Sequence, residues 1–177
     1  MFRPNSASIL LLPGFDEGWV IQTVDQLHSY ECQYNTISIK RRGVRGVRGL
    51  SIQPDQTFSM SLGCTHLLIP ECRASLPMLM TEPRIHRLIH AVLKDGGIVL
   101  VAASVAAAFT RVGLTRTFGE NYHVVTSPQH ISDFVHLLIR HECPAPYHNG
   151  KAVGGVGESA ENPRQPRNAP KIARHFI

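Results

Sequence analysis

The sequence predicts an α/β fold in which helices cover both faces of a mostly parallel β-sheet. Apolar strand-like runs alternate along the chain with segments of helical periodicity, which is the order expected of such a sheet. The stretch 98–114, IVLVAASVAAAFTRVGL, passes from a continuous apolar run directly into a helix of small residues. A length of 177 residues, with 43% hydrophobic and 18% charged residues, suits one globular domain with a sizeable core.

The first half of the chain is predicted to contain one helix and several strands. The helix spans residues 19–30, because Trp19, Val24 and Leu27 recur at helical spacing. The third strand is a brief extended piece that stops before Pro54. The predicted strands of this half are short apolar runs over residues 8–12, 34–39, 49–53 and 66–69.

The second half repeats the alternation on either side of a buried strand over residues 98–102. Pro83 suits the first turn of a helix over residues 83–94, where it removes only an N–H that has no helical partner. Asp95-Gly96-Gly97 ends that helix. The other predicted elements of this half are a helix over 105–112 that stops at Gly113, a strand over 123–126 and a helix over 131–141.

The junction between the strand 98–102 and the next helix is built like a nucleophile elbow. A sharp strand-to-helix turn lifts one side chain above the carboxyl edge of the sheet, beside the N–H groups of the helix. Hydrolases place a serine or cysteine nucleophile at this position. In this chain the position falls on Ala103 or, one residue later, on Ser104.

Five segments carry a family resemblance that runs from about residue 8 to residue 141. In chain order they are LLLPGFDE, VRGLSIQPD, HLLIPEC, TEPRIHRLIHAVLKDGGIVL and VVTSPQHISDFVHLLI. Together they resemble the ThiJ/PfpI family of deglycases, proteases and chaperone-like proteins, which has a class I glutamine amidotransferase-like fold. The resemblance implies a flavodoxin-like three-layer α/β/α sandwich. Only nine residues separate Gly113 from His123, where the family usually inserts further strands, so we expect a truncated C-terminal half.

The departures from the family pattern fall on its catalytic positions. The family's cysteine falls on Ala103, its neighbouring histidine on Ser104, and the glutamate that supports the cysteine on Trp19. Glu71 and Cys72 replace the glycines on the oxyanion side. A methyl group and an indole cannot supply a low-pKa thiolate with a carboxyl group in reach. The leading hypothesis is therefore a catalytically degenerate protein that acts as a binding or interaction module, with a regulatory role as one form of this.

An enzyme with a substitute nucleophile is the alternative hypothesis, although the alanine at the elbow weighs against it. A small-molecule hydrolase or aldehyde-processing enzyme would use the Cys72 thiol or the Ser104 hydroxyl, with Glu17 or Glu71 as the acid. Each group also has a structural interpretation. Ser104 suits the first turn of a helix, Cys72 a pocket lining, and an acid after the first strand suits a helix cap.

The residues expected around the inherited pocket come from the carboxyl ends of the predicted strands. They are Asp16, Trp19, Glu71, Cys72, Ala103 and Ser104. We expect strained or left-handed backbone at Ala103. We also expect the Trp19 ring to bury against Ala103 and close the pocket, because the helix that follows begins with small residues. Any thiol reactivity is expected at Cys72.

The histidine and cysteine spacings predict neither a metal site nor a cofactor. His86 and His90 are four residues apart on one predicted helix, but the sequence lacks the glutamate of an H-E-x-x-H motif, so a solvated helix face is the favoured interpretation. The four cysteines include no C-x-x-C pair, and we expect them to be reduced.

The strongest positive patch is the run KRRGVRGVRG over residues 40–49, which we expect to form a flexible loop. Its glycines would let several guanidinium groups converge on one phosphate backbone. Because no aromatic platform accompanies the run, nucleic-acid binding is not favoured.

Expectations about partners, location and domains complete the sequence analysis. No signal peptide or membrane-spanning segment is predicted, so we expect a cytoplasmic protein without a membrane partner. The family resemblance implies a homodimer, and a small-molecule ligand is an open alternative. Residues 1–141 are expected to form the ThiJ/PfpI-like domain, and residues 142–177 a tail rich in proline and glycine.

Overall fold

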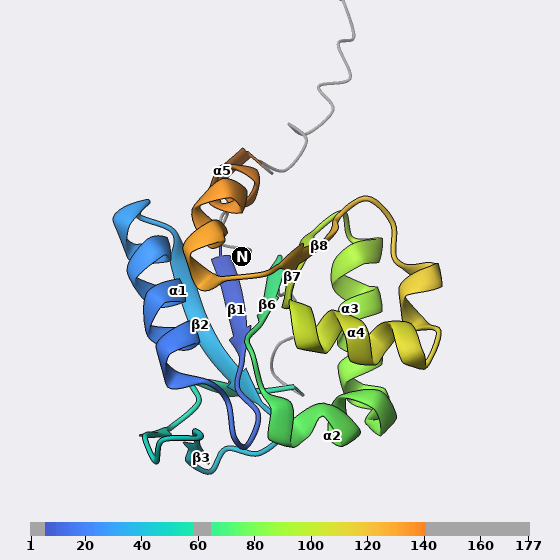
Figure 1. Ribbon diagram of the computed structural model, residues 1–177. Helices are drawn as coiled ribbons and strands as arrows, with labels where there is room; N and C mark the ends of the chain where they lie inside the picture. Colours follow the sequence, from blue (N-terminus) through green and yellow to red (C-terminus); the bar gives the residue numbers. More distant parts are fainter. Residues whose placement is uncertain (1–5, 59–64, 141–177) are drawn as a thin grey trace, which may run out of the picture. The chain divides into compact units, whose positions relative to one another are not determined.

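A six-stranded parallel sheet forms the centre of the described part of the chain (Figure 1). The computed structural model describes residues 6–58 and 65–140. The chain divides into two units, Met1–Ala145 and Pro146–Ile177, and all of the described residues lie in the first unit. The strand order is β5-β2-β1-β6-β7-β8, and every neighbouring pair is parallel. Helices cover both faces, so the predicted flavodoxin-like α/β/α sandwich is confirmed. The expected tail over residues 142–177 lies outside the described residues.

Five of the six strands of this sheet overlap segments predicted to be strands, and β5 was not predicted. The six strands are β1 (Ser6–Leu10), β2 (Gln33–Ser38), β5 (Gln56–Thr57), β6 (His66–Ile69), β7 (Ile98–Ala102) and β8 (Tyr122–Val125). Every residue of β6 and β7 is buried, as a parallel strand covered on both faces requires. Both of these strands have the predicted bounds, and they pair from His66 opposite Ile98 to Ile69 opposite Val101.

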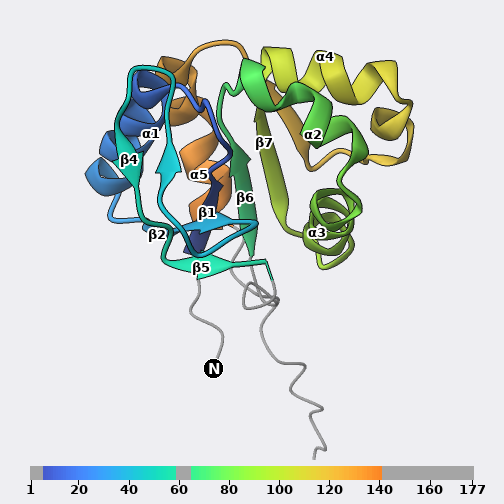
Figure 2. The same cartoon turned by 90° about the horizontal axis from the view of Figure 1, so that it is seen from below.

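The helices form two layers. Figures 1 and 2 show α1 (Glu17–Ser29) and α5 (Ser132–Arg140) on one face of the sheet. The helices on the other face are α2 (Leu76–Thr81), α3 (Pro83–Lys94) and α4 (Ala103–Arg111). Short 3-10 helices cover Arg73–Ser75, Leu114–Thr117 and Pro128–Ile131. The four predicted helices are confirmed, and α3 has the predicted bounds.

Local capping sets where the helices begin and end. Asp16 precedes α1 and its Oδ1 accepts the N–H of Trp19 at 2.8 Å. Glu82 caps α3 in the same way and accepts the N–H of Arg84. Gly113 ends α4 in a left-handed conformation, φ 75°, which a residue with a Cβ rarely adopts.

The sequence did not predict every element. The basic run was expected to be a loop, but Val44–Arg45 forms strand β3, which pairs antiparallel with β4 (Ser51–Ile52). Helix α2 and strand β5 were also missed. Each is too short for a periodic pattern to stand out, because β5 has two residues and α2 six. No helix in the described part of the chain is long and apolar enough to cross a membrane.

Gly97 provides a test of the packing between α3 and the sheet. A Cβ at this position would overlap the carbonyl oxygen of Thr65 and lie 2.8 Å from Cγ1 of Val92. We expect Gly97→Ala to lower the free energy of unfolding by about 2–3 kcal/mol, because backbone must shift to admit the methyl group. Urea denaturation measures this loss. Gly119→Ala is the matched control, since no atom lies within 4 Å of its Cβ position, and an equal loss in both variants would contradict this packing.

Candidate functional site

The strand–helix elbow lies where the sequence predicts it, but its backbone is unstrained. Ala102 is extended (φ −62°, ψ 152°), and Ala103 is already the first residue of α4. The expectation of left-handed geometry at Ala103 is wrong, because Glu31 is the one non-glycine residue with positive φ among the described residues. The change from extended backbone at Ala102 to helical backbone at Ala103 is enough to form the turn. The methyl group of Ala103 is exposed to solvent at this turn.

Ser104 and Glu71 form a hydrogen bond beside the elbow. Ser104 Oγ donates to Glu71 Oε1 at 2.5 Å. The two residues follow β7 and β6, and adjacent parallel strands bring their carboxyl ends to one edge of the sheet. Arg73 Nε also donates to Glu71 Oε1, at 3.2 Å, but its side chain is 85% exposed, so this ion pair contributes little. Ser104 lies in the first turn of α4, as its structural interpretation expects, but its hydroxyl donates to a carboxylate and does not cap the helix.

Asp16 joins the turn after β1 to the same edge. Its backbone N–H donates to the carbonyl oxygen of Glu71 at 2.8 Å, while its carboxylate caps α1 through Trp19. The capping interpretation of Asp16 is confirmed. The structure therefore brings together Asp16, Glu71 and Ser104, three of the residues that were predicted to surround the pocket.

Glu17 is buried, and its carboxylate holds the basic hairpin. The side chain is 4% exposed, and Oε1 accepts the backbone N–H of Arg48 at 2.6 Å and of Leu50 at 3.3 Å. Burial raises the pKa of Glu17, but these N–H groups, with those of Glu17 itself and Gly49, outweigh burial and lower it. A Cβ on Gly46 would lie 2.5 Å from Oε1, so glycine is needed for this approach. Glu17 is thus a structural anion and is not available as a general base.

Cys72 lies at the predicted edge of the sheet but is a poor nucleophile. Its residue is 1% exposed, and burial, with a smaller effect of the Glu71 charge, raises the pKa of the Cys72 thiol to about 12. A thiol with such a pKa is almost entirely protonated at neutral pH. Burial at the end of β6 therefore weighs against Cys72 as a reactive cysteine, and its reactivity stays a prediction to be tested.

Trp19 is buried as predicted but does not close the elbow. Its residue is 6% exposed and belongs to the hydrophobic core. Ala103, however, is exposed, so the indole does not cover it. The physical reason is the layering, because Trp19 lies on α1 and Ala103 on α4, which cover opposite faces of the sheet (Figure 2).

The histidine pair on α3 packs against apolar residues. His86 is half-buried, and its Nε2 lies 2.7 Å from the carbonyl oxygen of Leu79. Its ring meets Phe109 edge to face, and the exposed ring of His90 meets Phe118 in the same way. The expectation of a solvated face is therefore wrong for His86. Across residues 6–58 and 65–140, no group of three His, Cys, Asp or Glu side chains is placed to hold a metal ion.

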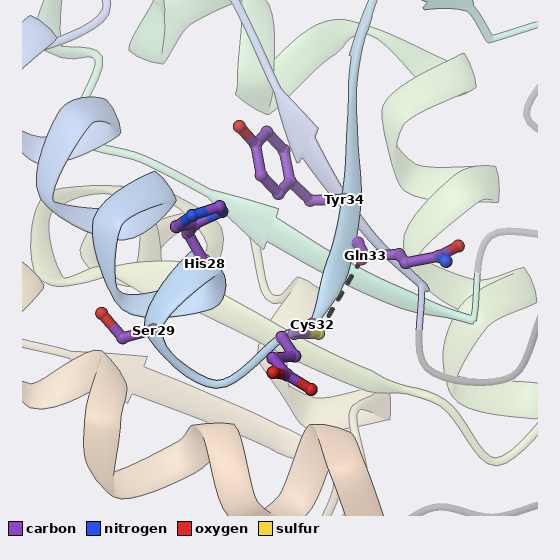
Figure 3. A pocket seen from close by; sticks show the side chains of 6 residues that line it. His28, Ser29, Cys32, Gln33 and Tyr34 are labelled. Atoms are coloured by element: carbon purple, nitrogen blue, oxygen red, sulfur yellow. Dashed lines mark hydrogen bonds between the residues drawn. The ribbon is translucent and has the colours of Figure 1, made fainter. Parts of the chain in front are cut away.

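A surface hollow lies away from the elbow, at the opposite end of the strands. Its volume is about 630 Å³, and Figure 3 shows the residues around the connection from α1 to β2 that line it. They are His28, Ser29, Glu31, Cys32, Gln33 and Tyr34. Cys32 is buried there, which raises the pKa of its thiol. None of the residues predicted for the pocket lines this hollow.

Comparison with known proteins gives the fold. No family model and no curated protein matches the sequence. A cysteine-to-alanine mutant of a DJ-1 superfamily protein from Salmonella typhimurium has 19% identity and a TM-score of 0.59, with 76% of this chain and 88% of that chain covered. Drosophila melanogaster DJ-1beta has 16% identity and a TM-score of 0.61, with 77% and 89% covered. The fold is that of the DJ-1/ThiJ/PfpI superfamily.

A third solved structure shows how much of a similar protein this chain covers. The ThiJ/PfpI domain protein from Brachyspira murdochii has 12% identity and a TM-score of 0.62, with 77% of this chain and 95% of that chain covered. The similarity therefore extends over nearly the whole of that protein.

Two contacts of the site escaped the sequence analysis. The Ser104–Glu71 hydrogen bond joins residues 33 positions apart, and the Glu17–Arg48 bond residues 31 positions apart. One signal was present, because each acid lies in the segment that follows a predicted strand, at one edge of the sheet. To predict that these acids accept hydrogen bonds, one must know which donors the fold places opposite them.

Glu17 makes the stability of the protein dependent on pH. Its pKa is lowered in the folded protein, whereas the unfolded chain binds the proton near the ordinary value of about 4.3. Its stabilisation is thus complete above that value and is lost as the pH falls through the lower pKa of the folded state. We expect Glu17→Gln to lower the melting temperature at pH 7 and to flatten its fall between about pH 5 and pH 3.

Thermal denaturation over this pH range measures the effect, with Glu120→Gln as the control because Glu120 is exposed. A variant at Glu17 whose acid profile coincides with that of the control would contradict the role of the buried carboxylate.

Native thiol chemistry gives a second test. Cys32 and Cys72 are both buried, so we expect neither to react with iodoacetamide in the folded protein at pH 7.5. Mass spectrometry of labelled peptides measures the extent of reaction, and labelling in guanidinium chloride supplies the unfolded control. Fast native labelling of Cys72 would show that its thiol is open and would restore it as a nucleophile. Cys64 and Cys143 lie outside the described residues.

Proposed function

We propose that this protein is a catalytically degenerate member of the DJ-1/ThiJ/PfpI superfamily and acts as a binding or interaction module. The main support for this proposal is that Ala103, an exposed alanine, occupies the first position of α4 at the elbow. A nucleophile at this position would be stabilised as an anion by the N-terminus of the helix. Alanine retains the turn and removes the chemistry.

The surrounding polar groups support this proposal because each already has an internal partner. The Ser104 hydroxyl donates to Glu71, Asp16 caps α1, and Glu17 accepts N–H groups of the hairpin. The Cys72 thiol is buried and protonated. What remains at the elbow is a small exposed surface, which suits recognition of a partner better than bond cleavage.

Two further parts of the proposal concern the assembly and the ligand of the protein. We propose that the protein works as a cytoplasmic homodimer, and that a small-molecule ligand or a regulatory partner is recognised at the carboxyl edge of the sheet. Gel filtration with light scattering tests the dimer.

One observation favours the alternative, a small-molecule hydrolase. The hydrogen bond from Ser104 Oγ to Glu71 Oε1, at 2.5 Å, is the geometry in which a carboxylate accepts a proton from a nucleophilic hydroxyl. The pair also lies at the N-terminus of α4, where an oxyanion would be stabilised. The Cys72 version of this alternative loses support because its thiol is buried.

Activity measurements separate the two proposals. For a degenerate protein we expect p-nitrophenyl acetate to be hydrolysed, and glyoxal to be converted, no faster than in buffer without protein. The Ser104→Ala variant should give the same rates as the wild type. If the wild type hydrolyses the ester and Ser104→Ala and Glu71→Gln each lower the rate by about 100-fold or more, the hydrolase alternative replaces the degenerate one.

Restoring the thiol tests the elbow itself. We expect the sulfur introduced by Ala103→Cys to react with iodoacetamide with an apparent pKa below the free value of about 8.5, since the N-terminus of α4 favours a thiolate. Adding Glu71→Gln should lower that pKa further by removing a negative charge. Thr110→Cys supplies an exposed thiol near the other end of the same helix as the control. An equal pKa at both positions would contradict an inherited nucleophile site.

A further inference from the structure

One basic run accounts for the net positive charge of the chain. The sequence has 18 Lys and Arg against 13 Asp and Glu, a net charge of +5. The run that leads into and forms the β3–β4 hairpin supplies five cations and no acid: Lys40, Arg41, Arg42, Arg45 and Arg48. The rest of the sequence therefore has 13 residues of each sign. Among the described residues none of these five side chains forms an ion pair, and all five are exposed.

Two aliphatic side chains project from the same hairpin. Val47 is 66% exposed and Leu50 is 45% exposed, on either side of Arg48. They lie in the turn between β3 and β4, which the bond from Gly46 N to Leu50 O closes at 2.8 Å. The hairpin therefore presents cationic and apolar side chains on the same surface.

Hydrogen bonds to the segment between β1 and α1, and to Glu17, hold the β3–β4 turn against the domain. Val47 N donates to the carbonyl oxygen of Phe15 at 3.0 Å, and Gly14 N donates to that of Arg45 at 2.8 Å. The buried Glu17 carboxylate accepts from Arg48 N and Leu50 N. These hydrogen bonds occupy backbone groups of the hairpin, while its guanidinium groups and aliphatic side chains remain exposed to solvent.

The same contacts restrict which polyanion fits. A phosphate held in a glycine-rich loop is bound by the backbone N–H groups of that loop, but here Glu17 already accepts those of Arg48 and Leu50. Residues 40–53 contain no aromatic side chain on which a base would stack. Side-chain cations around exposed aliphatic residues suit a surface of diffuse negative charge with an apolar interior, which describes an anionic lipid bilayer.

We propose that the β3–β4 hairpin is a peripheral docking surface for anionic membranes, with Arg45 and Arg48 facing lipid headgroups and Val47 and Leu50 entering the interfacial layer. The lack of a spanning helix led us to expect no membrane partner, but surface binding needs no such helix. The proposal is independent of the activity at the elbow.

Vesicle co-sedimentation of the full chain tests the proposal. We expect binding to phosphatidylcholine vesicles that contain about 30% phosphatidylserine, little binding to phosphatidylcholine alone, and weaker binding as salt is raised. Arg45→Gln with Arg48→Gln should weaken partitioning about 25-fold at low salt, since each cation near the surface contributes about fivefold. The matched control, Arg87→Gln with Lys94→Gln on α3, removes the same charge from exposed positions elsewhere and should bind like the wild type apart from a small general loss.

The aliphatic part of the surface has its own readout. Val47→Ser with Leu50→Ser should weaken vesicle binding several-fold while its salt dependence stays unchanged, because no charge is removed. Circular dichroism confirms that each variant is folded before binding is compared.

Three outcomes would overturn the proposal. They are no binding to the anionic vesicles, equal losses in the hairpin and α3 pairs, and binding of a single-stranded DNA oligonucleotide under conditions in which the vesicles stay unbound. The last outcome would identify the hairpin as a nucleic-acid surface.

Discussion

The parallel alignment of β1, β6 and β7 is the constraint on which the candidate site depends. Their carboxyl ends meet at one edge of the sheet, so the segments that follow them must pack together. The hydrogen bond from Asp16 N to the carbonyl oxygen of Glu71 joins two of these segments. The bond from Ser104 Oγ to the Glu71 carboxylate joins the third. A register change in any of the three strands would separate these residues.

The acids at this edge stabilise the protein's own structure. Each carboxylate meets a donor from a neighbouring segment: Asp16 an N–H of α1, Glu71 a hydroxyl of α4, and Glu17 the backbone of the hairpin. A buried carboxylate is tolerated only when hydrogen bonds offset its desolvation, and Glu17 meets that condition at Oε1. The same bonds that make the edge stable reduce its capacity for acid–base chemistry, which agrees with the alanine at the elbow.

Glu17 also links the core to the charged surface. By accepting N–H groups of the hairpin, it turns the backbone inward and leaves the arginine side chains in solvent. A glycine-rich run that is expected from its composition to be a flexible loop is therefore a fixed structure. The absence of a side chain at Gly46 is what permits the carboxylate to approach this closely.

The sequence by itself predicted most of the strands and helices in their order along the chain, and the bounds of α3, β6 and β7. The periodicity of α3 and its proline start, the apolar runs of β6 and β7 and the glycine after α4 are local signals that act within a few residues. The alanine at the elbow is also a local fact. The family resemblance, spread over five segments, gave the fold class that the solved structures share.

Only the tertiary structure decided the roles of the polar residues. Sequence reasoning made Glu17 and Glu71 candidate acids and Cys72 a candidate nucleophile. The Arg48 N–H that donates to Glu17 and the Ser104 hydroxyl that donates to Glu71 each lie more than 30 positions away along the chain. It also placed Trp19 against Ala103, although helices on opposite faces of the sheet carry them. Burial, hydrogen-bond partners and pKa values depend on which distant segments meet, and a pattern read along one chain contains no distances between such segments.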